Sequence, residues 1–438
     1  MIKEKKSVRL FIAGCWIAGV FVFLAGCATL ITPEKGSDEA IEAQRRAFGK
    51  AAVERVRRKE PATTPDWVNL IPEKVADILI EKNFYKEGEV WGLAKRNPYQ
   101  KLEYEEAGSI TFLSMVDRFN LWDRVPVLDK RAKQKALEFW QSWQDPQTGL
   151  FKDPRDPQRH VNEKYVVILI NQFGGEPLYP RKKTVQAVAK DSSGRFDTSI
   201  FVKRTKDDPG WARGGWGVGS HTGFMAVEIF RAINDGHTEL IADLEKGIEQ
   251  ILSHQDPNSG LWGPPSADLT NRIGGTLKVV SRLYFHIGMK VPHTKELADS
   301  LISHQQNGDW LRCGTNFCLP QNVAILATYC LEVCDYRHAE LLGVLEKLAE
   351  DYLLWVNPDG SLLSRRGDRS SVGIEYVHIQ SLGIIGAYLH WADCRLPNNF
   401  ESSERGVGYR YRCVLQKDGR VKVVDTTNCG TYEELEVK

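Results

Sequence analysis

The segment SHQDPNSGLW (Ser253–Trp262) decides the fold, because it ends one amphipathic stretch and has close variants elsewhere in the chain. SWQDPQTGLF occupies Ser142–Phe151, and SHQQNGDW occupies Ser303–Trp310. In each copy a Gln follows a helical pattern of apolar residues, a helix-stopping sequence comes next, and a Gly then permits a positive φ. An aromatic residue stands two positions after the Gly. We interpret each copy as a helix stop whose aromatic residue packs under the neighbouring helices.

Turns of the form Gly-x-apolar, and one looser match, recur about every fifty residues, at Gly88, Gly149, Gly194, Gly260, Gly308 and Gly360. Each interval accommodates two helices of about fifteen residues with their connections. Segments such as TKELADSLISHQ carry apolar residues at the spacing of an amphipathic helix. One helical pair cannot bury its apolar face alone. The sequence therefore predicts an all-α fold, an (α/α)6 toroid of six helical pairs over residues 67–397.

The spacing of Gln, Gly and Trp or Phe resembles the QW repeat of terpenoid cyclases. Over about residues 67–395 the chain resembles the α/α toroid superfamily of those cyclases and the protein prenyltransferases. The resemblance implies the fold but not an activity. The sequence lacks the Asp-x-Asp-Asp run of hopene-type cyclases, and no Asp, Cys and His set matches the prenyltransferase zinc ligands. CGTN (Cys313–Asn316) starts like the thioester motif of complement-like toroids but lacks its Glu-Gln.

The first residues follow the order of a secretory signal: a basic segment, an apolar run and then LAGC (Leu24–Cys27). LAGC resembles the lipobox of bacterial lipoproteins, which implies cleavage after a signal peptide of residues 1–26 and acylation of Cys27. The protein would then be lipid-anchored in the bacterial cell envelope, and Ala28 favours the outer membrane by that family's sorting rule. An uncleaved transmembrane anchor is the alternative. Residues 27–66 are expected to be a linker with a charged, solvated helix.

Charge and cysteine content limit the remaining functions. The chain has 58 basic and 57 acidic residues, a balance that does not suggest a nucleic-acid partner. Cys413 and Cys429 flank VLQKDGRVKVV, which predicts a small β-hairpin in the tail 398–438 and makes these two residues the expected disulfide. The other cysteines lack a Cys-x-x-Cys spacing, so we expect no metal site and no cofactor.

Residues that follow the turns at the same phase of a closed ring should meet at one end of it. On this basis the expected catalytic residues are His221, Asp268, Arg272, Glu375 and His378, and the expected substrate-binding residues are Trp216, Asn271, Asn316 and Asn322. The glycine-rich segment Ala212–Gly223 matches neither a dinucleotide-binding motif nor a P-loop. We expect it to expose Trp216 and His221 at the mouth of the ring, with a plain packing loop as the alternative.

Two of these residue pairs also have a purely structural interpretation. Arg272 can clamp a substrate carboxylate with its guanidinium fork. Alternatively, Asp268 caps a helix and Arg272 pairs with Asp268 four residues on. His378 can act as an acid or base, or it can form a buried pair with Glu375.

Two functions of different classes fit this sequence. The first is a glycan-active enzyme, either a hydrolase with two carboxylates about 5 to 9 Å apart or a uronate lyase. In a lyase, Asn271 and Arg272 would neutralise the carboxylate while His221 or His378 acts as the base. The second is a non-catalytic binding or scaffold lipoprotein. A terpenoid-cyclase-like enzyme ranks third, because the acid motif is missing and the segments after the turns are charged.

Overall fold

The computed structural model describes residues 38–57, 60–71, 73, 84–87, 90–94, 130–154, 161, 163–179, 189–190, 196–308, 318–353, 356, 372–396 and 403–426. These residues are mostly helical, which confirms the predicted all-α class at that level. The helices are α1 (Asp38–Val56), α2 (Asp66–Asn69), α5 (Lys130–Gln141), α6 (Glu163–Gln172), α7 (Ser199–Asp207), α8 (Trp216–Asn234), α9 (Ile241–Leu252), α10 (Leu269–Leu283), α11 (Thr294–Gln306), α13 (Leu319–Val333), α14 (His338–Tyr352) and α15 (Val372–Tyr388).

The described strands form four small two-stranded sheets. Antiparallel pairs join β2 (Phe84–Glu87) to β3 (Val90–Ala94), β4 (Ala189–Lys190) to β5 (Phe196–Asp197), and β7 (Tyr411–Leu415) to β8 (Val421–Asp425). The fourth pair is parallel and joins β1 (Ala62–Thr63) to β6 (Trp391–Ala392). This last pair ties the N-terminal region to the segment that follows α15.

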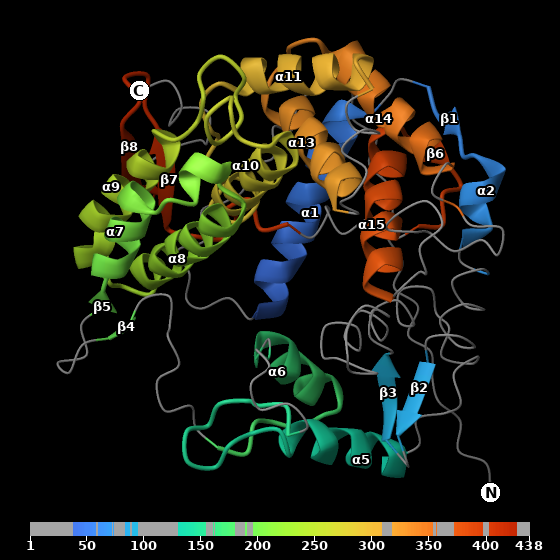
Figure 1. The fold of residues 1–438 in the computed structure, drawn as a ribbon, viewed down its shortest axis with the longest axis vertical. Helices are drawn as coiled ribbons and strands as arrows, with labels where there is room; N and C mark the ends of the chain where they lie inside the picture. The colour runs from blue at the N-terminus through green and yellow to red at the C-terminus, as the bar shows by residue number, and fades with distance from the viewer. Residues whose placement is uncertain are drawn as a thin grey trace, which may run out of the picture.

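The helices from α7 to α15 form two layers that curve in an arc (Figure 1). The inner layer is α8, α10, α13 and α15, each packed against the next. The outer layer is α7, α9, α11 and α14, which pack behind the inner helices. The chain alternates between an outer and an inner helix, so each consecutive pair is one helical hairpin. Helices α5 and α6 form a further pair.

Neighbouring inner helices run parallel, as their register shows. A Cβ atom added at Gly219 of α8 would lie 3.2 Å from Val279 on α10, whereas one at Gly223 would meet Arg282 further along. Between α13 and α15, Gln321 bonds Gln380 near one end and Glu332 bonds Tyr388 near the other. Residue numbers therefore rise together on both helices of each pair. Each outer helix returns the chain to the start of the next inner helix.

The helix starts confirm the predicted repeat of about fifty residues. Helices α6, α8, α10, α13 and α15 begin at residues 163, 216, 269, 319 and 372. Two of the predicted turns were nevertheless wrong. The turn at Gly194 leads into the outer helix α7, so it is out of phase, and Trp91 lies in β3 rather than in a helical turn. The connection between α7 and α8 instead uses Asp208, whose side chain accepts the backbone N–H of Gly210.

Glycines in the segment 212–223 allow α8 and α10 to pack closely. Any side chain at Gly275 on α10 would collide with the backbone of Gly214, and one at Gly223 would collide with Arg282. A side chain at Gly274 would collide with the indole of Trp216. The expected glycine-rich loop is therefore wrong beyond Gly215, because α8 starts at Trp216 and its Gly219 and Gly223 are contact points with α10.

Helix α1 crosses the carboxyl ends of the inner helices, in contact with α13 and α15 (Figure 1). Ala52, Val53 and Val56 on its packed side are at most 5% exposed. The expectation of a fully solvated helix was therefore wrong. Arg45 on α1 forms an ion pair of 3.8 Å with Glu404, which also pairs with Arg231 at the end of α8 at 2.6 Å.

Glu404 anchors this end of the molecule electrostatically. Burial would raise the pKa of Glu404, but the neighbouring His286 and the charges of Arg231 and Arg45 outweigh burial and hold the pKa at about 2. Next to it, Arg405 donates from Nη2 to Glu332 at 2.8 Å, and both side chains are almost fully buried. Because Glu332 also accepts from Tyr284 and Tyr388, one carboxylate joins α10, α13, α15 and the C-terminal segment.

The pair β7–β8 packs on the outer helix α9. Glu245 and Glu249 of α9 accept the backbone N–H groups of Val423 and Val421 at 2.8 and 2.9 Å, so carboxylates cover one edge of this sheet. Cys413 on β7 is buried and is a free thiol. Burial raises the pKa of this thiol. The predicted disulfide is therefore not formed at Cys413, and Cys429 lies outside the described residues.

Candidate functional site

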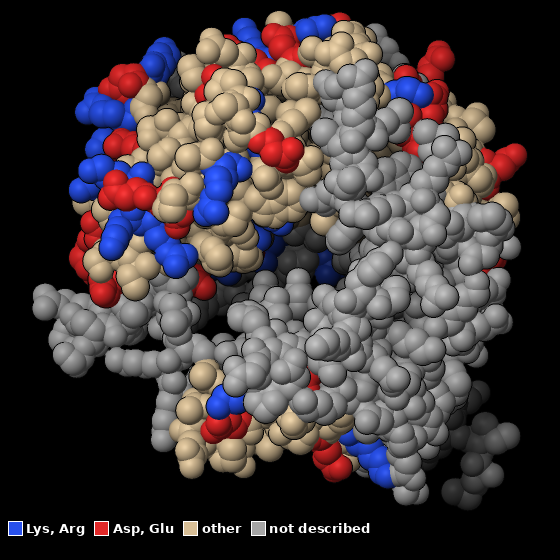
Figure 2. Space-filling model, viewed as in Figure 1, with Lys and Arg blue, Asp and Glu red and all other residues tan. Residues whose placement is uncertain are grey.

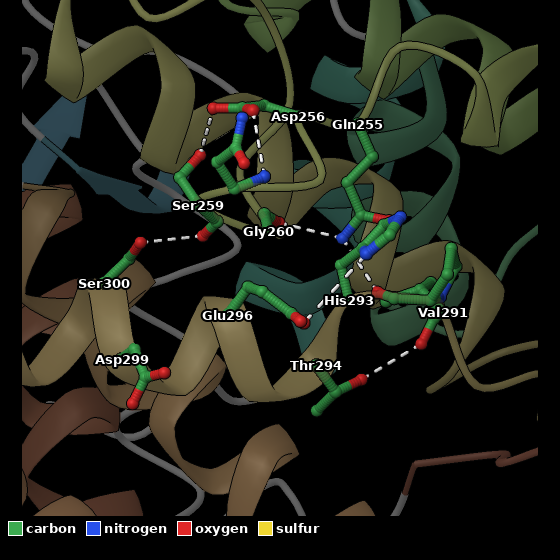
Figure 3. A network of polar contacts seen from close by, with 12 residues as sticks. Gln255, Asp256, Ser259, Gly260, Val291, His293, Thr294, Glu296, Asp299 and Ser300 are labelled. Atoms are coloured by element: carbon green, nitrogen blue, oxygen red, sulfur yellow. Dashed lines mark hydrogen bonds and ion pairs between the residues drawn. The ribbon is translucent and has the colours of Figure 1, made fainter.

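Two Gln-Asp-Pro turns follow helices α5 and α9 and lead toward α6 and α10. Gln255 Nε2 donates to the carbonyls of Gly260 and Pro292, both at 2.9 Å (Figure 3). Gln144 makes the equivalent bonds to Gly149 at 2.9 Å and Tyr179 at 2.8 Å. In both cases the side-chain amide bonds one carbonyl within its own turn and a second carbonyl about 35 residues further along the chain. The predicted bracing role of these glutamines is thus confirmed for the two copies.

Arg272 belongs to this structural turn and not to the concave side. Its Nη2 lies 2.9 Å from a carboxylate oxygen of Asp256 and 2.7 Å from the hydroxyl of Ser259. Ser259 in turn is held by Ser300 on the outer helix α11 (Figure 3). The guanidinium is 8% exposed and faces the outer layer. The guanidinium that was expected to clamp a substrate carboxylate is thus paired with Asp256 of the protein itself.

Asp268 caps α10, as the structural interpretation expected. A carboxylate oxygen of Asp268 accepts the backbone N–H of Asn271 at 3.0 Å. The predicted partner of Arg272 was wrong, since the guanidinium pairs with Asp256 instead of Asp268. Asn271 is exposed at the start of α10 and lies beside the backbone of Gly214. It remains at the rim of the inner layer.

Trp216 and His221 both lie on α8, on the side that faces away from the outer layer. The indole of Trp216 is half-buried and covers Gly274 of α10. The exposed positions of α8 are Gly217, His221, Phe224, Glu228 and Arg231, a stripe with helical spacing. In this arrangement His221 is exposed and Trp216 is half-buried, while their expected roles in a site stay predictions.

The remaining predicted residues do not join them. His378 is fully buried, and its ring meets that of Tyr352 on the outer helix α14 at 5.2 Å. The expectation that Asp268, Arg272 and His378 converge in one cleft was wrong, because Arg272 and His378 face the outer layer. Asn322 is 2% exposed, on α13. Asn316, Cys27 and the side chain of Glu375 lie outside the described residues.

A row of polar side chains does meet on the concave side of the inner helices. We call Ser220, Lys278, Gln321 and Gln380 the concave belt, one residue from each of α8, α10, α13 and α15. All four are half-buried. Lys278 packs against α8, because a Cβ atom built on Gly219 of α8 would lie 3.7 Å from the Cβ atom of Lys278. Gln321 Nε2 donates to Gln380 Oε1 at 3.0 Å and so links α13 to α15.

Exposure along each helix shows that the belt lies on the side of the inner helices that is not fully buried. Between Arg272 and Phe285 on α10, only Lys278, Ser281 and Arg282 are not fully buried. On α13, Gln321 and Ile325 are the corresponding positions. Figure 2 shows Lys and Arg side chains within a hollow of the molecule. Helix α1 and residues 403–409 lie across the carboxyl ends of the inner helices.

Aromatic and cationic groups flank the concave belt. The guanidinium of Arg282 lies 3.7 Å above the centroid of the Phe224 ring, and its Nη1 is 2.8 Å from His286 Nε2. Burial lowers the pKa of Lys278, and the charge of Arg282 lowers it further. The belt was missed in the sequence because its members lie one or more turns inside each helix. Lys278 was nevertheless visible as a lysine on the apolar segment IGGTLKVV.

The described part of the chain has neither a metal-binding cluster nor a membrane-spanning helix. It contains no cluster of three or more His, Cys, Asp or Glu residues that could hold a metal ion. No helix in it is both long enough and apolar enough to span a bilayer. In comparisons with protein-family models, with curated proteins and with solved structures, nothing matches this chain.

Proposed function

We propose that this chain is a lipid-anchored protein of the bacterial cell envelope, in which a closed α/α toroid binds a glycan on its concave side. Five helical pairs with the predicted repeat support the toroid. The order of basic, apolar and LAGC segments supports the anchor at Cys27 and a place in the outer membrane.

The concave belt is the observation that carries glycan binding. Amide, hydroxyl and ammonium groups from four helices face the same space, and such groups pair with sugar hydroxyls in either direction. Trp216 and Phe224 add aromatic faces next to the belt, and the apolar faces of sugar rings can pack on them. A few convergent polar groups beside aromatic rings are typical of small-ligand sites.

The described geometry favours binding over hydrolysis. A glycosidase needs two carboxylates on opposite sides of the scissile bond. Among the described residues, Glu228 is the single carboxylate on the exposed stripe of α8, and the concave sides of α10, α13 and α15 add no second one. We therefore propose a receptor or carrier and keep hydrolase and lyase activity as outcomes of the test.

The test uses the full-length protein purified from membranes. Mass spectrometry of the N-terminus should find an acylated Cys27, and an intact Met1 would contradict the anchor. A glycan array followed by titration calorimetry should identify a ligand whose affinity falls about tenfold in Gln321→Leu, because two hydrogen-bonding groups are lost. Gln147→Leu, in the exposed turn after α5, is the matched control and should bind normally. Release of shorter sugars would instead show an enzyme, and no glycan binding at all would refute the proposal.

A further inference from the structure

Helix α1 concentrates positive charge in a chain that is otherwise acidic. The stretch RRAFGKAAVERVRRK (Arg45–Lys59) contains seven basic residues and one acidic residue. Residues 1–26 contain four basic residues and one acidic residue, and the whole chain contains 58 basic and 57 acidic residues. The rest of the chain is therefore net acidic. The acidic residues of α1 stand mainly at its start, at Asp38, Glu39 and Glu42, where they suit the helix dipole.

One side of α1 is fixed to the helical arc, and the rest of its surface carries the charge. Ala52, Val53 and Val56 are buried where α1 contacts α13 and α15. Lys50 and Arg55 lie away from this packed side and are exposed. The helix therefore presents an ammonium and a guanidinium group to the outside from a rigid base.

The length of chain before α1 places this surface near the expected lipid anchor. Ten residues, 28–37, separate Cys27 from the first residue of α1. Because a chain extends by at most about 3.3–3.6 Å per residue, α1 starts within about 40 Å of the anchored cysteine. Anionic headgroups attract basic residues that come within about 8–10 Å, the screening length near physiological salt. Helix α1 is the first described helix after the anchor, so it is the one best placed to meet the bilayer.

We infer that α1 is a second membrane contact, in which Lys50, Arg55 and the neighbouring basic residues bind anionic phospholipid headgroups. This inference rests on the proposed lipid anchor at Cys27 and adds the orientation of the protein on the bilayer. A basic helix on an acidic body forms an electric dipole, so an anionic surface attracts the α1 side and repels the rest. Since α1 crosses the carboxyl ends of the inner helices, these ends would face the membrane (Figure 1).

The experiment measures how far a membrane shields Lys50 in the full protein purified from membranes. The protein is reconstituted in vesicles of phosphatidylcholine, with or without phosphatidylglycerol, and treated with a water-soluble amine-acylating reagent. Mass spectrometry then gives the extent of acylation at each lysine. At low salt we expect Lys50 to react at least about fivefold more slowly on the phosphatidylglycerol vesicles, because one basic residue near such a surface changes the binding constant by about that factor. The difference should disappear at high salt, where the charges are screened. Lys246, exposed on α9, should react equally on both vesicles.

A charge reversal separates binding at α1 from a general effect of the anionic surface. Arg55→Glu changes the charge of α1 by two units, which should weaken the attraction more than about tenfold and restore most of the reactivity of Lys50. Lys246→Glu makes the same change on α9 and is the matched control, which should leave Lys50 protected. Both variants replace exposed side chains, so both should unfold at the Tm of the wild type.

The outcomes distinguish the membrane contact from the anchor. Equal reactivity of Lys50 on both vesicles, in a protein with an acylated Cys27, would overturn the contact and leave the anchor in place. An intact Met1 together with protection of Lys50 on phosphatidylglycerol would refute the anchor while supporting the contact. Loss of protection in Lys246→Glu as large as in Arg55→Glu would overturn the assignment to α1.

Discussion

Replacement of Gln255 by Leu tests whether the Gln-Asp-Pro turns hold adjacent helical pairs together. The side chain is 5% exposed, and its Nε2 supplies hydrogen bonds of 2.9 Å to Gly260 and Pro292. Leucine keeps a similar volume but leaves two carbonyls without this donor. At about 1–2 kcal/mol for each buried acceptor, the free energy of unfolding should fall by about 2–4 kcal/mol. For a protein of this size, that loss corresponds to a Tm lower by roughly 2–4 °C.

Calorimetry and hydrogen–deuterium exchange measure this effect globally and locally. Exchange should increase in peptides that cover residues 256–263 and 291–297, on the two sides of the lost bridge. Gln144→Leu should behave in the same way in the equivalent turn, whereas Gln147→Leu should leave Tm unchanged because Gln147 is exposed. If Gln255→Leu melts with the wild type, or if Gln147→Leu loses as much stability, the bracing role is refuted.

Three further predictions concern the packing of the inner helices and their carboxyl ends. Glu404, whose pKa is held at about 2, should stabilise the fold fully above about pH 4.5 and lose this contribution as the pH falls toward 2. The difference in urea midpoint between wild type and Glu404→Gln should shrink over that range, and a constant difference would contradict it. Gly275→Ala should lower the free energy of unfolding by about 3 kcal/mol or more, because the added methyl group pushes α8 away from α10. Its control is Gly217→Ala, where nothing lies near the added methyl group, and thermal unfolding should show this variant as stable as the wild type or slightly more stable. Arg405→Met should lower the free energy of unfolding by about 3–5 kcal/mol, because the Glu332 carboxylate is then buried without its cation. The double variant Arg405→Met/Glu332→Gln should regain part of this stability, and a double variant no more stable than Arg405→Met would argue against the pair.

The fold was readable from the sequence where local chemistry decides the structure. A helix stop such as Asp256-Pro257 acts within a few residues, so its meaning does not depend on distant contacts. The recurrence of these stops predicted the helical repeat. The prediction failed at Gly194 because outer and inner helices start after similar turns, and the sequence pattern alone does not distinguish the two layers.

The site was harder to predict, because the direction of a side chain depends on its exact position around a helix. Adjacent residues on a helix point about 100° apart. Arg272 and Lys278 both belong to α10, but the first faces the turn at Asp256 while the second faces the concave side. Residues at equal distances from their turns therefore lie at the same level of the arc, but their side chains do not point to the same side of the inner layer.

Burial and pairing together distinguish the two kinds of charged residue in α10. Arg272 is nearly inaccessible and has an acidic partner, so its charge is used within the fold. Lys278 is half-buried on the concave side, where burial and the charge of Arg282 lower the pKa of its ammonium group. A fold under selection for stability alone would favour an apolar residue at position 278, since a methionine would fill similar space without desolvating an ammonium group. The lysine at this position of an otherwise apolar helix keeps its ammonium group on the concave side, where it belongs to the belt that we propose binds a glycan.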